Sequence, residues 1–473
     1  MRTGYKNFKL RLLGGVFMLA ATVAAPKADA ETLADALVGA YTHSGLLDQN
    51  RALLRAADED VAQAISTLKP VLRWTASITQ NFGRVRSSAV TGTVHNTDLT
   101  TTLNLIAEWL IYDFGARKFR VEAAKETVLA TRDSLLDIEQ QVLLRAIAAY
   151  MGVIEASEFV ALRNNNVRLL IQELRAARDR FEVGEVTRTD VALAEAQLAN
   201  ARSGLAGAQG DLLRAAEEFR NVVGRAPGRL QQPPRLPNVG RDLGAAKALA
   251  VRQHPAMQSV QHSVAAADLL TEASNADMRP TVRLQGTLGV TENLSENQFN
   301  RSGSIGLQAG QTLYQGGALS SVARQRMSQA AAQRANLHIV RHNLQQDVGN
   351  AFASLSSARA QLEASDRQIR AARIAFRGIR EEATLGARTT LDVLDAEQSL
   401  LDAQSIQVSA RANLYVAAYS MLAATGQLTA QKLKLPVQIY DASAYYKLVK
   451  DAPVKRSKQG EDLDRVLRAL QKD

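Results

Sequence analysis

The sequence predicts a mainly helical protein built from two copies of one unit: a helix, a pair of strands and a long helical hairpin. Three observations lead to this prediction. Two long stretches of the 473-residue chain, 71–226 and 281–435, contain no proline, so most of their length is free to be helical. Related residues recur at a constant offset of 202 residues. Near the start of each copy, apolar and polar residues alternate, as they do in half-buried strands.

The composition narrows the possible classes of function. The chain has 46% apolar residues, a formal net charge of +10 and no cysteine. Disulfides, a thiol nucleophile, thiolate zinc sites and a lipid-modified N-terminal cysteine are therefore excluded. Only 6 histidines and 5% aromatic residues are present, which suits a long helical protein better than an enzyme built around a metal. We expect no enzymatic activity, no metal site and no cofactor.

Residues 1–30 have the composition of a secretory signal peptide. A basic start is followed by an apolar run from Leu12 to Ala25 and by the small residues of Ala28-Asp29-Ala30. The alternative is a cytosolic chain with an apolar N-terminus. Without this segment the net charge falls to +6 and forms no concentrated stripe, so nucleic-acid binding is not expected.

An internal duplication organises the rest of the chain. Tyr112 to Ala116 matches Tyr314 to Ala318, and Asp190-Val191 matches Asp392-Val393, at the same offset and without a gap. Upstream, Pro70 and Pro280 match at an offset of 210. The predicted division is a first repeat at 31–226, a proline-rich linker at 227–240, a second repeat at 241–435 and a C-terminal segment at 436–473.

Each repeat begins with a predicted helix of about 35 residues, from Thr32 to Leu68 and from Leu243 to Met278. Two strands of about ten residues follow, the length that a membrane-spanning strand requires. A soluble hairpin with one core face is the alternative. The loops at 83–96 and 291–301 are polar. The apolar face is formed by Leu72, Trp74, Ala76, Ile78 and Phe82, then Leu99, Leu103, Leu105, Ala107 and Trp109, and in the second repeat by Val282, Leu284, Leu288 and Val290, then Ile305, Leu307, Ala309 and Leu313.

Long helices complete each repeat, one starting at Ala116 and the other at Ala318. About 65 residues at 1.5 Å each give a helix of about 100 Å, which needs neighbouring helices for stability. Turns follow at Gly184 and Gly386, where shorter return helices begin. Glycines 224 and 426 are suitable C-caps for these return helices. The polar run at 455–460 is predicted to be disordered, and 461–473 has the pattern of a short amphipathic helix.

The string from Leu385 to Glu397, with its partner from Val183 to Val191, resembles the corresponding turns of the TolC family of outer-membrane channel-tunnels. The resemblance covers about residues 31–435. It implies that three protomers each give four strands to one twelve-stranded barrel in outer-membrane lipid of a Gram-negative bacterium. The long helices would then form a periplasmic tunnel. Such a homotrimer is a passive export duct, opened at its periplasmic end by an adaptor protein and an inner-membrane ABC or RND transporter.

The resemblance also assigns a periplasmic gate. Arg388 matches an arginine that ties the second turn to a neighbouring first hairpin, and Thr189 and Asp190 match its partners. One position departs from the family. Ala383 stands where the best-known members carry a tyrosine that helps to hold the gate, so Arg388 is expected to hold a larger share of the closed state.

Two acidic residues, Asp392 and Asp395, match the acidic rings that line the family's entrance. Threefold symmetry would bring six carboxylates around one axis, where they select cations. The alternative is that Asp392 only caps a helix and Asp395 lies on a solvated face.

Two further pairs of residues receive predicted roles. Gly184 and Gly386, at the turns, are expected to lie where the adaptor makes contact. Trp74 and Trp109 are either an aromatic girdle at the membrane interface or core aromatics, and we favour the girdle. A second class of function remains open, a soluble periplasmic coiled-coil scaffold. The sequence does not name the exported substrate.

Overall fold

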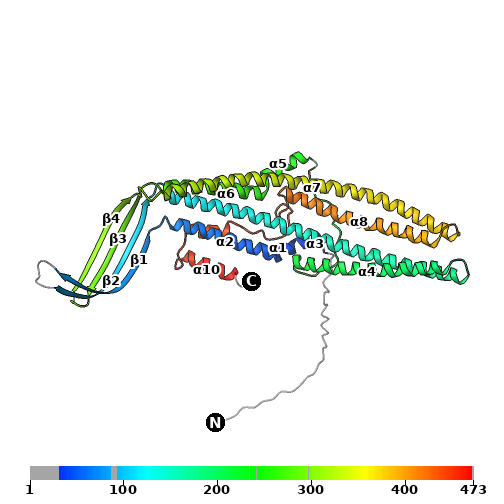
Figure 1. Cartoon of the computed structure of the whole chain (residues 1–473), viewed down its shortest axis with the longest axis horizontal. Helices are drawn as coiled ribbons and strands as arrows, with labels where there is room; N and C mark the ends of the chain where they lie inside the picture. The colour runs from blue at the N-terminus through cyan, green and yellow to red at the C-terminus, as the bar shows by residue number, and fades with distance from the viewer. Residues whose placement is uncertain (1–30, 87–92, 234, 241, 297, 471–473) are drawn as a thin grey trace, which may run out of the picture.

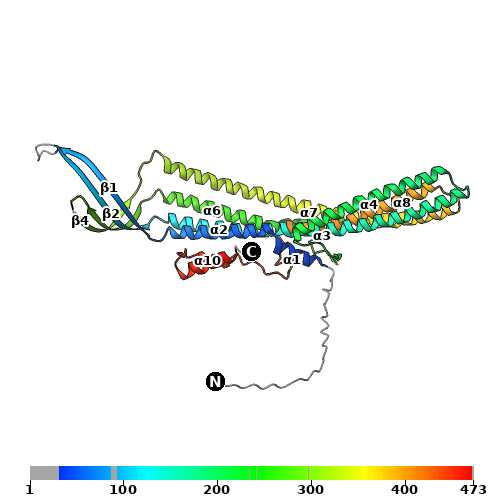
Figure 2. The same ribbon diagram turned by 90° about the horizontal axis from the view of Figure 1, so that it is seen from below.

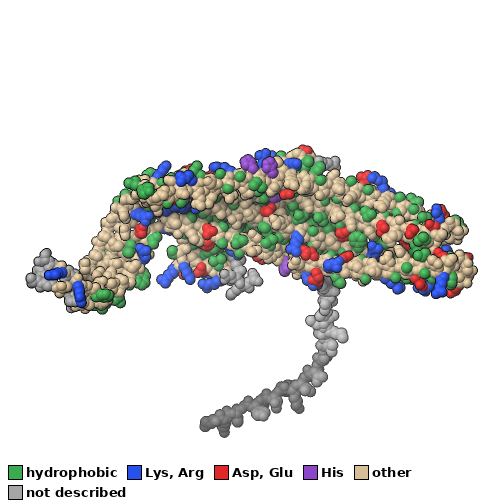
Figure 3. Space-filling view, viewed as in Figure 1, with side chains coloured by type: hydrophobic (Ala, Val, Ile, Leu, Met, Phe, Trp, Pro, Cys, Tyr) green, Lys and Arg blue, Asp and Glu red, His purple; other side chains and the backbone are tan. Residues whose placement is uncertain are grey.

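The computed structural model describes residues 31–86, 93–233, 235–240, 242–296 and 298–470, so the predicted signal peptide lies outside the described residues. The molecule is elongated, with a curved sheet at one end and long helices leading away from it (Figure 1). Acidic and basic side chains are interspersed along the helical part (Figure 3). Within these described ranges, no helix combines the length and apolar character needed to cross a membrane.

The helix predicted at the start of each repeat is divided into two. In the first repeat, α1 (Leu33–His43) ends at Ser44, whose hydroxyl accepts a hydrogen bond from Leu47 N at 3.3 Å and starts α2 (Gly45–Ser66). In the second repeat, α5 (Leu243–Gln253) ends at His254, and α6 (Pro255–Ala276) begins with proline at its first position. The prediction of one continuous helix was wrong because a residue before proline avoids the helical conformation, and a serine that caps a new helix also interrupts the old one.

The four strands form one antiparallel sheet in the order β1-β2-β3-β4. They are β1 (Val71–Arg86), β2 (Thr93–Tyr112), β3 (Thr281–Asn293) and β4 (Gln298–Gly310). They are longer than predicted, because residues 83–86 and 93–96 of the expected first loop continue the β1–β2 ladder. Pairing supplies partners for their backbone polar groups, so the strands continue beyond the predicted ends.

The strand register confirms the predicted apolar face. Trp74 pairs with Leu105, Leu105 with Leu288, and Leu288 with Gly303, so one row crosses the sheet. The opposite face is polar, with Arg283 Nη1 3.0 Å from Glu108 Oε1. In a single chain the apolar face is open: Trp74 is 70% exposed and Ile305 is 81% exposed. The sheet is therefore amphipathic with no core of its own beneath the apolar side.

Two long helical hairpins follow the strand pairs. The first is α3 (Ala116–Glu182) with α4 (Arg188–Val223), and the second is α7 (Ala318–Thr384) with α8 (Thr390–Ala424). Helices α3 and α7 have 67 residues each, which corresponds to about 100 Å. Gly224 caps α4 in the left-handed conformation at φ +87°, as predicted, and Gly426 adopts φ +72° one residue after the C-cap of α8.

The main core lies in the middle of the molecule, where α1, α2, α5 and α6 pack against the long helices α3 and α7. Tyr150 of α3 is fully buried there, and its hydroxyl donates to the backbone oxygen of Glu31 at 2.9 Å. The C-terminal segment forms α9 (Ala444–Val449) and α10 (Lys458–Leu470), which lies beside α2 (Figure 2). The prediction that residues 455–460 are disordered was wrong: 455–457 form a turn, and 458–460 are the first residues of α10. Four buried residues anchor this segment: Ala62, Tyr445, Val449 and Leu463.

Candidate functional site at the hairpin turns

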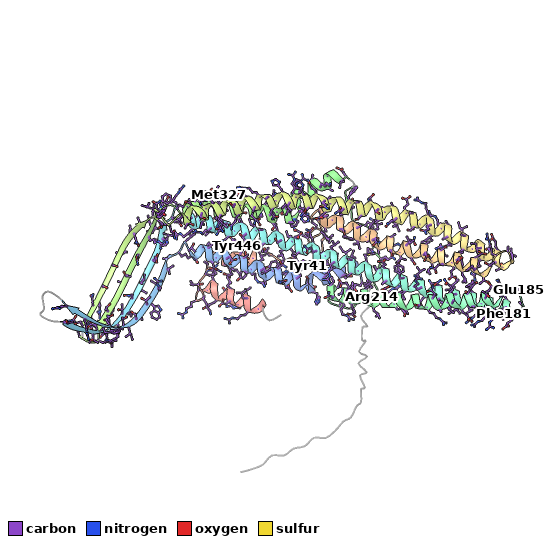
Figure 4. The ribbon with its side chains drawn as sticks, viewed as in Figure 1. Tyr41, Phe181, Glu185, Arg214, Met327 and Tyr446 are labelled. Carbon is purple, nitrogen blue, oxygen red and sulfur yellow. The ribbon has the colours of Figure 1, made fainter. Side chains whose placement is uncertain are left out.

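The two hairpin turns lie at the end of the molecule that is farthest from the sheet (Figures 1 and 2). Phe181 and Glu185 mark the α3–α4 turn at this end (Figure 4). The α7–α8 turn ends close to it in both views. Most of the residues to which the sequence assigns a function are therefore gathered at one end.

The first turn has the geometry of a glycine-terminated helix. Gly184 adopts φ +80°, a conformation that L-residues rarely take. Its backbone N donates to Phe181 O at 3.0 Å, and Glu185 N donates to Arg180 O at 2.9 Å. This is the Schellman arrangement. An added Cβ at Gly184 would meet nothing within 4 Å, so the backbone conformation, not crowding, calls for glycine.

The second turn repeats the first. Gly386 adopts φ +77°, and its backbone N donates to Ala383 O at 3.2 Å. The N–H of Ala387 donates to Glu382 O at 2.9 Å. The two glycines recognised in the sequence thus end the long helices by the same local mechanism.

The return helices also begin alike. Thr187 caps α4, and the carboxylate of Asp190 accepts from Thr187 N at 2.9 Å and from its hydroxyl at 2.7 Å. In the second hairpin, Asp392 accepts from Thr389 N and from its hydroxyl, both at 2.9 Å. These hydrogen bonds hold the pKa of both aspartates below its usual range. Asp392 is therefore a helix-capping residue, as one interpretation of the sequence proposed, and it is held in the charged form that an acidic ring needs.

Within one chain, Arg388 does not bridge the two hairpins. Its Nε donates to Glu382 Oε2 at 2.8 Å, so it pairs inside its own turn. Both side chains are about half exposed. Thr189 and Asp190, its predicted partners, lie in the first turn of α4. The gate contact with a neighbouring copy of the chain stays a prediction; within one chain, Glu382 binds the guanidinium of Arg388.

The remaining predicted positions at this end are Asp395 and Ala383. Asp395 is exposed on α8, almost one turn after Asp392. Ala383 is buried with Phe376 and Val393 in a small apolar cluster of the second hairpin. At this position a methyl group packs inside the hairpin, where the family's tyrosine would offer a hydroxyl.

Polar contacts that the sequence analysis missed join the two hairpins. Asn166 of α3 donates its Nδ2 to Glu397 Oε1 of α8 at 2.7 Å, and both side chains are buried. Closer to the turns, Arg380 Nη2 lies 3.1 Å from Glu173 Oε1. Burial raises the pKa of Glu397 to about 7. A signal was present in the sequence, because Glu397 follows Val393 and precedes Leu401 at helical spacing on an apolar stripe.

The two tryptophans lie at the opposite end, on the apolar face of the sheet. The indole N–H of Trp109 donates to Leu68 O at 3.0 Å, where α2 leads into β1. Trp74 pairs with Leu105, four residues along β2 from Trp109. Their role as an interfacial girdle stays a prediction.

Known proteins share this architecture. A profile described as "Outer membrane efflux protein" matches residues 40–225 and 248–427, one range in each repeat. The outer membrane efflux protein BepC of Brucella suis is 32% identical over 451 residues, covering 95% of this chain and 97% of BepC. The alkaline protease secretion protein AprF of Pseudomonas aeruginosa is 29% identical over 279 residues, 56% of this chain and 57% of AprF. The solved structure of the outer membrane protein VceC of Vibrio cholerae has a TM-score of 0.73 at 21% identity, covering 83% of this chain and 96% of VceC.

Proposed function

This chain belongs to the outer membrane efflux protein family, and we propose that three copies of it assemble into the outer-membrane duct of an export system. The chain is an outer-membrane export channel and not an enzyme. The soluble scaffold is not favoured, since its sheet would have to leave a broad apolar face in water. The observation that carries the function is the family match over both repeats together with this amphipathic sheet.

The edges of the sheet support assembly into a closed ring. In one chain β1 and β4 are the two edge strands. Unpaired backbone groups are too costly in lipid, so β4 of one copy would pair with β1 of the next until the barrel closes. Three copies with four strands each give the twelve-stranded barrel that the resemblance implies. Outer-membrane lipid would cover the apolar face.

The hairpin turns offer a surface for the periplasmic adaptor. Around the turn glycines, Val183 is 71% exposed and Leu385 is 84% exposed. Apolar side chains that are exposed to water at the hairpin turns favour contact with another protein. The adaptor would link these turns to an inner-membrane ABC or RND transporter, which supplies the energy. Among the relatives, one name refers to efflux and another to secretion of an alkaline protease, so both kinds of cargo are candidates.

At the entrance, Asp392 and Asp395 would form two acidic rings in the trimer. The capping hydrogen bonds favour the ionised form of Asp392, and Asp395 is exposed. Six carboxylates around a narrow axis attract cations and bind multivalent cations more strongly than a single site does.

The same turns would form the gate. In the closed trimer, Arg388 would leave or share Glu382 and reach Asp190 or Thr189 of a neighbouring copy. An exposed ion pair of this kind contributes little per copy, because water and salt screen it. The contributions of the three symmetry-related contacts add, so a weak contact in each copy can shift the equilibrium between closed and open states.

Membrane extraction and assembly test the proposal together. We expect carbonate washing to leave the protein in the membrane fraction, and mild detergent to release a trimer by light scattering. The trimer should form ion-conducting channels in planar bilayers. Release by carbonate, or a monomer in mild detergent, would contradict the duct.

A further inference from the structure

Two polar contacts join the two hairpins: Asn166 of α3 with Glu397 of α8, and Glu173 of α3 with Arg380 of α7. We call these four residues the inter-hairpin latch. We propose that this latch is operated by a proton, so that the hairpins are held together when Glu397 is neutral and loosen when it is ionised. The proposal rests on the proposed function only in placing the latch near the entrance of a duct.

The geometry of Glu397 is unusual for a carboxyl group. Its side chain is 5% exposed, and one oxygen, Oε1, accepts from Asn166 at 2.7 Å. The other oxygen, Oε2, is buried without a hydrogen-bond partner among the described residues. A buried carboxylate with an unpaired oxygen is costly, whereas a neutral carboxyl in the same place costs far less.

The charged groups that face Glu397 do not cancel its charge. Helix α3 presents Glu173, a like charge that disfavours ionisation, and α7 presents Arg380, which favours it. Arg380, however, lies 3.1 Å from Glu173 and is shared with it. Burial therefore dominates, and the pKa of Glu397 is raised to about 7.

The sign of the effect follows from this difference. With the hairpins together, Glu397 binds a proton up to about pH 7. When they separate, water reaches the carboxyl and its pKa returns toward the ordinary range of about 4.3. Closing thus takes up a proton between about pH 4.3 and about pH 7, so the latch is tightest in acid, loosens as pH rises across this range and changes little above about pH 7.

The duplicated sequence indicates that this arrangement is not required by the hairpin itself. At the offset of 202, Arg380 and Glu397 correspond to Arg178 and Glu195. In the first hairpin these two form an ion pair with each other, about half exposed. In the second hairpin the same two residue types instead contact α3 of the first. Arg380 and Glu397 therefore contact the first hairpin and do not pair with each other.

The absence of cysteine in the chain allows a direct test in the full trimer. Glu185→Cys and Ala387→Cys place one spin label at each exposed turn, and an excess of unlabelled chain restricts the measured distances to pairs within one copy. For the wild-type latch we expect the ratio of short to long distances to fall roughly thirtyfold between pH 5.5 and pH 8.5, with most of the fall complete by about pH 7.

Two variants and a control complete the experiment. Glu397→Gln keeps the shape but cannot ionise, so the short distance should persist at both pH values. Asn166→Leu removes the hydrogen bond that favours the ionised form, so the pH at which the distance ratio levels off should move higher. Glu195→Gln, the matched change in the first hairpin, should titrate like the wild type.

A wild-type distance distribution that does not change with pH would overturn the latch. A Glu397→Gln protein that still responds to pH, or an Asn166→Leu distance ratio that levels off at the same or a lower pH, would do the same. The readout is a distance within one copy and needs no conductance. Failure of the latch would therefore leave the duct standing, and a protein released by carbonate would refute the duct without deciding the latch.

Discussion

The two helical hairpins share their local structure but differ in their contacts. Both long helices end at a left-handed glycine, and both return helices begin with a threonine cap and an aspartate three residues later. Yet α3 contributes many residues to the main core, whereas α7 keeps apolar side chains such as Ile339 and Ile374 exposed in one chain. Duplication thus copied the signals that end and start helices, while each copy found its own neighbours.

The same contrast appears in one pair of charged residues. Arg178 and Glu195 of the first hairpin pair with each other, but Arg380 and Glu397 of the second contact the first hairpin. The same residue types at matching positions therefore form a half-exposed ion pair in the first hairpin and contacts between the hairpins in the second, of which that of Glu397 is buried. Four experiments sharpen or break this comparison, from the largest expected effect to the smallest.

Removing an aromatic residue should give the largest difference in effect between the two hairpins. Tyr150 is fully buried in α3, and Phe352, at the matching position of α7, is only partly buried. We expect Tyr150→Ala to cost about 3–5 kcal/mol of unfolding free energy, and Phe352→Ala clearly less. The midpoint of thermal unfolding of the detergent-solubilised protein measures both. Equal losses would contradict the idea that the first hairpin carries more of the core.

The ion selectivity of the entrance should depend on acidic residues of the second hairpin only. Asp392→Asn together with Asp395→Asn should abolish cation preference and block by multivalent cations in planar bilayers, because the carboxylates that attract cations are gone. The position that matches Asp395 in the first hairpin is Leu193. Leu193→Asp is therefore a control that should leave selectivity as it is. Unchanged selectivity in the double variant would remove these residues from the entrance.

The helix caps, in contrast, should respond alike. Thr187→Ala and Thr389→Ala should each cost about 1 kcal/mol of local helix stability. The paired aspartates have lowered pKa values, so their contribution is present above about pH 3.9 and is lost as pH falls through the pKa of the folded state. Hydrogen exchange of the first-turn amides of α4 and α8 measures this. A clear difference between the two helices would show that the turns are not equivalent.

The gate contact should have the smallest energy per copy. Arg388→Ser removes a guanidinium whose ion pairs at this exposed site are weakened by solvent screening. We expect higher single-channel conductance and greater sensitivity of cells to large antibiotics such as vancomycin. Asp190→Ala should act in the same way, and the double variant should add little.

The competing partner of Arg388 supplies a control for that experiment. Because Glu382 holds Arg388 within its own turn, Glu382→Gln should free the guanidinium for the neighbouring copy and lower conductance. Conductance equal to wild type in both single variants, Arg388→Ser and Asp190→Ala, would refute the gate while leaving the fold intact.

The sequence predicted most of the fold because its signals are local. Glycine at a left-handed position, a capping threonine with its aspartate, and alternation along a strand act over a few residues. The turns at Gly184 and Gly386 and the apolar face of the sheet follow from them. The helix breaks at Ser44 and His254 were missed, although serine and a residue before proline are themselves local signals. The lengths of the strands depend on pairing and were underestimated.

The sequence by itself determined the duplication, the positions of the turns, the amphipathic sheet and, through resemblance, the family. Only the tertiary structure decided which side chains of the two hairpins meet: Glu397 with Asn166, and Arg380 with Glu173. The physical reason is that a cap or a turn is completed by residues within five positions of each other, whereas Asn166 and Glu397 are 231 residues apart. Their contact, and the burial that raises the pKa of Glu397, exist only once the two hairpins pack side by side.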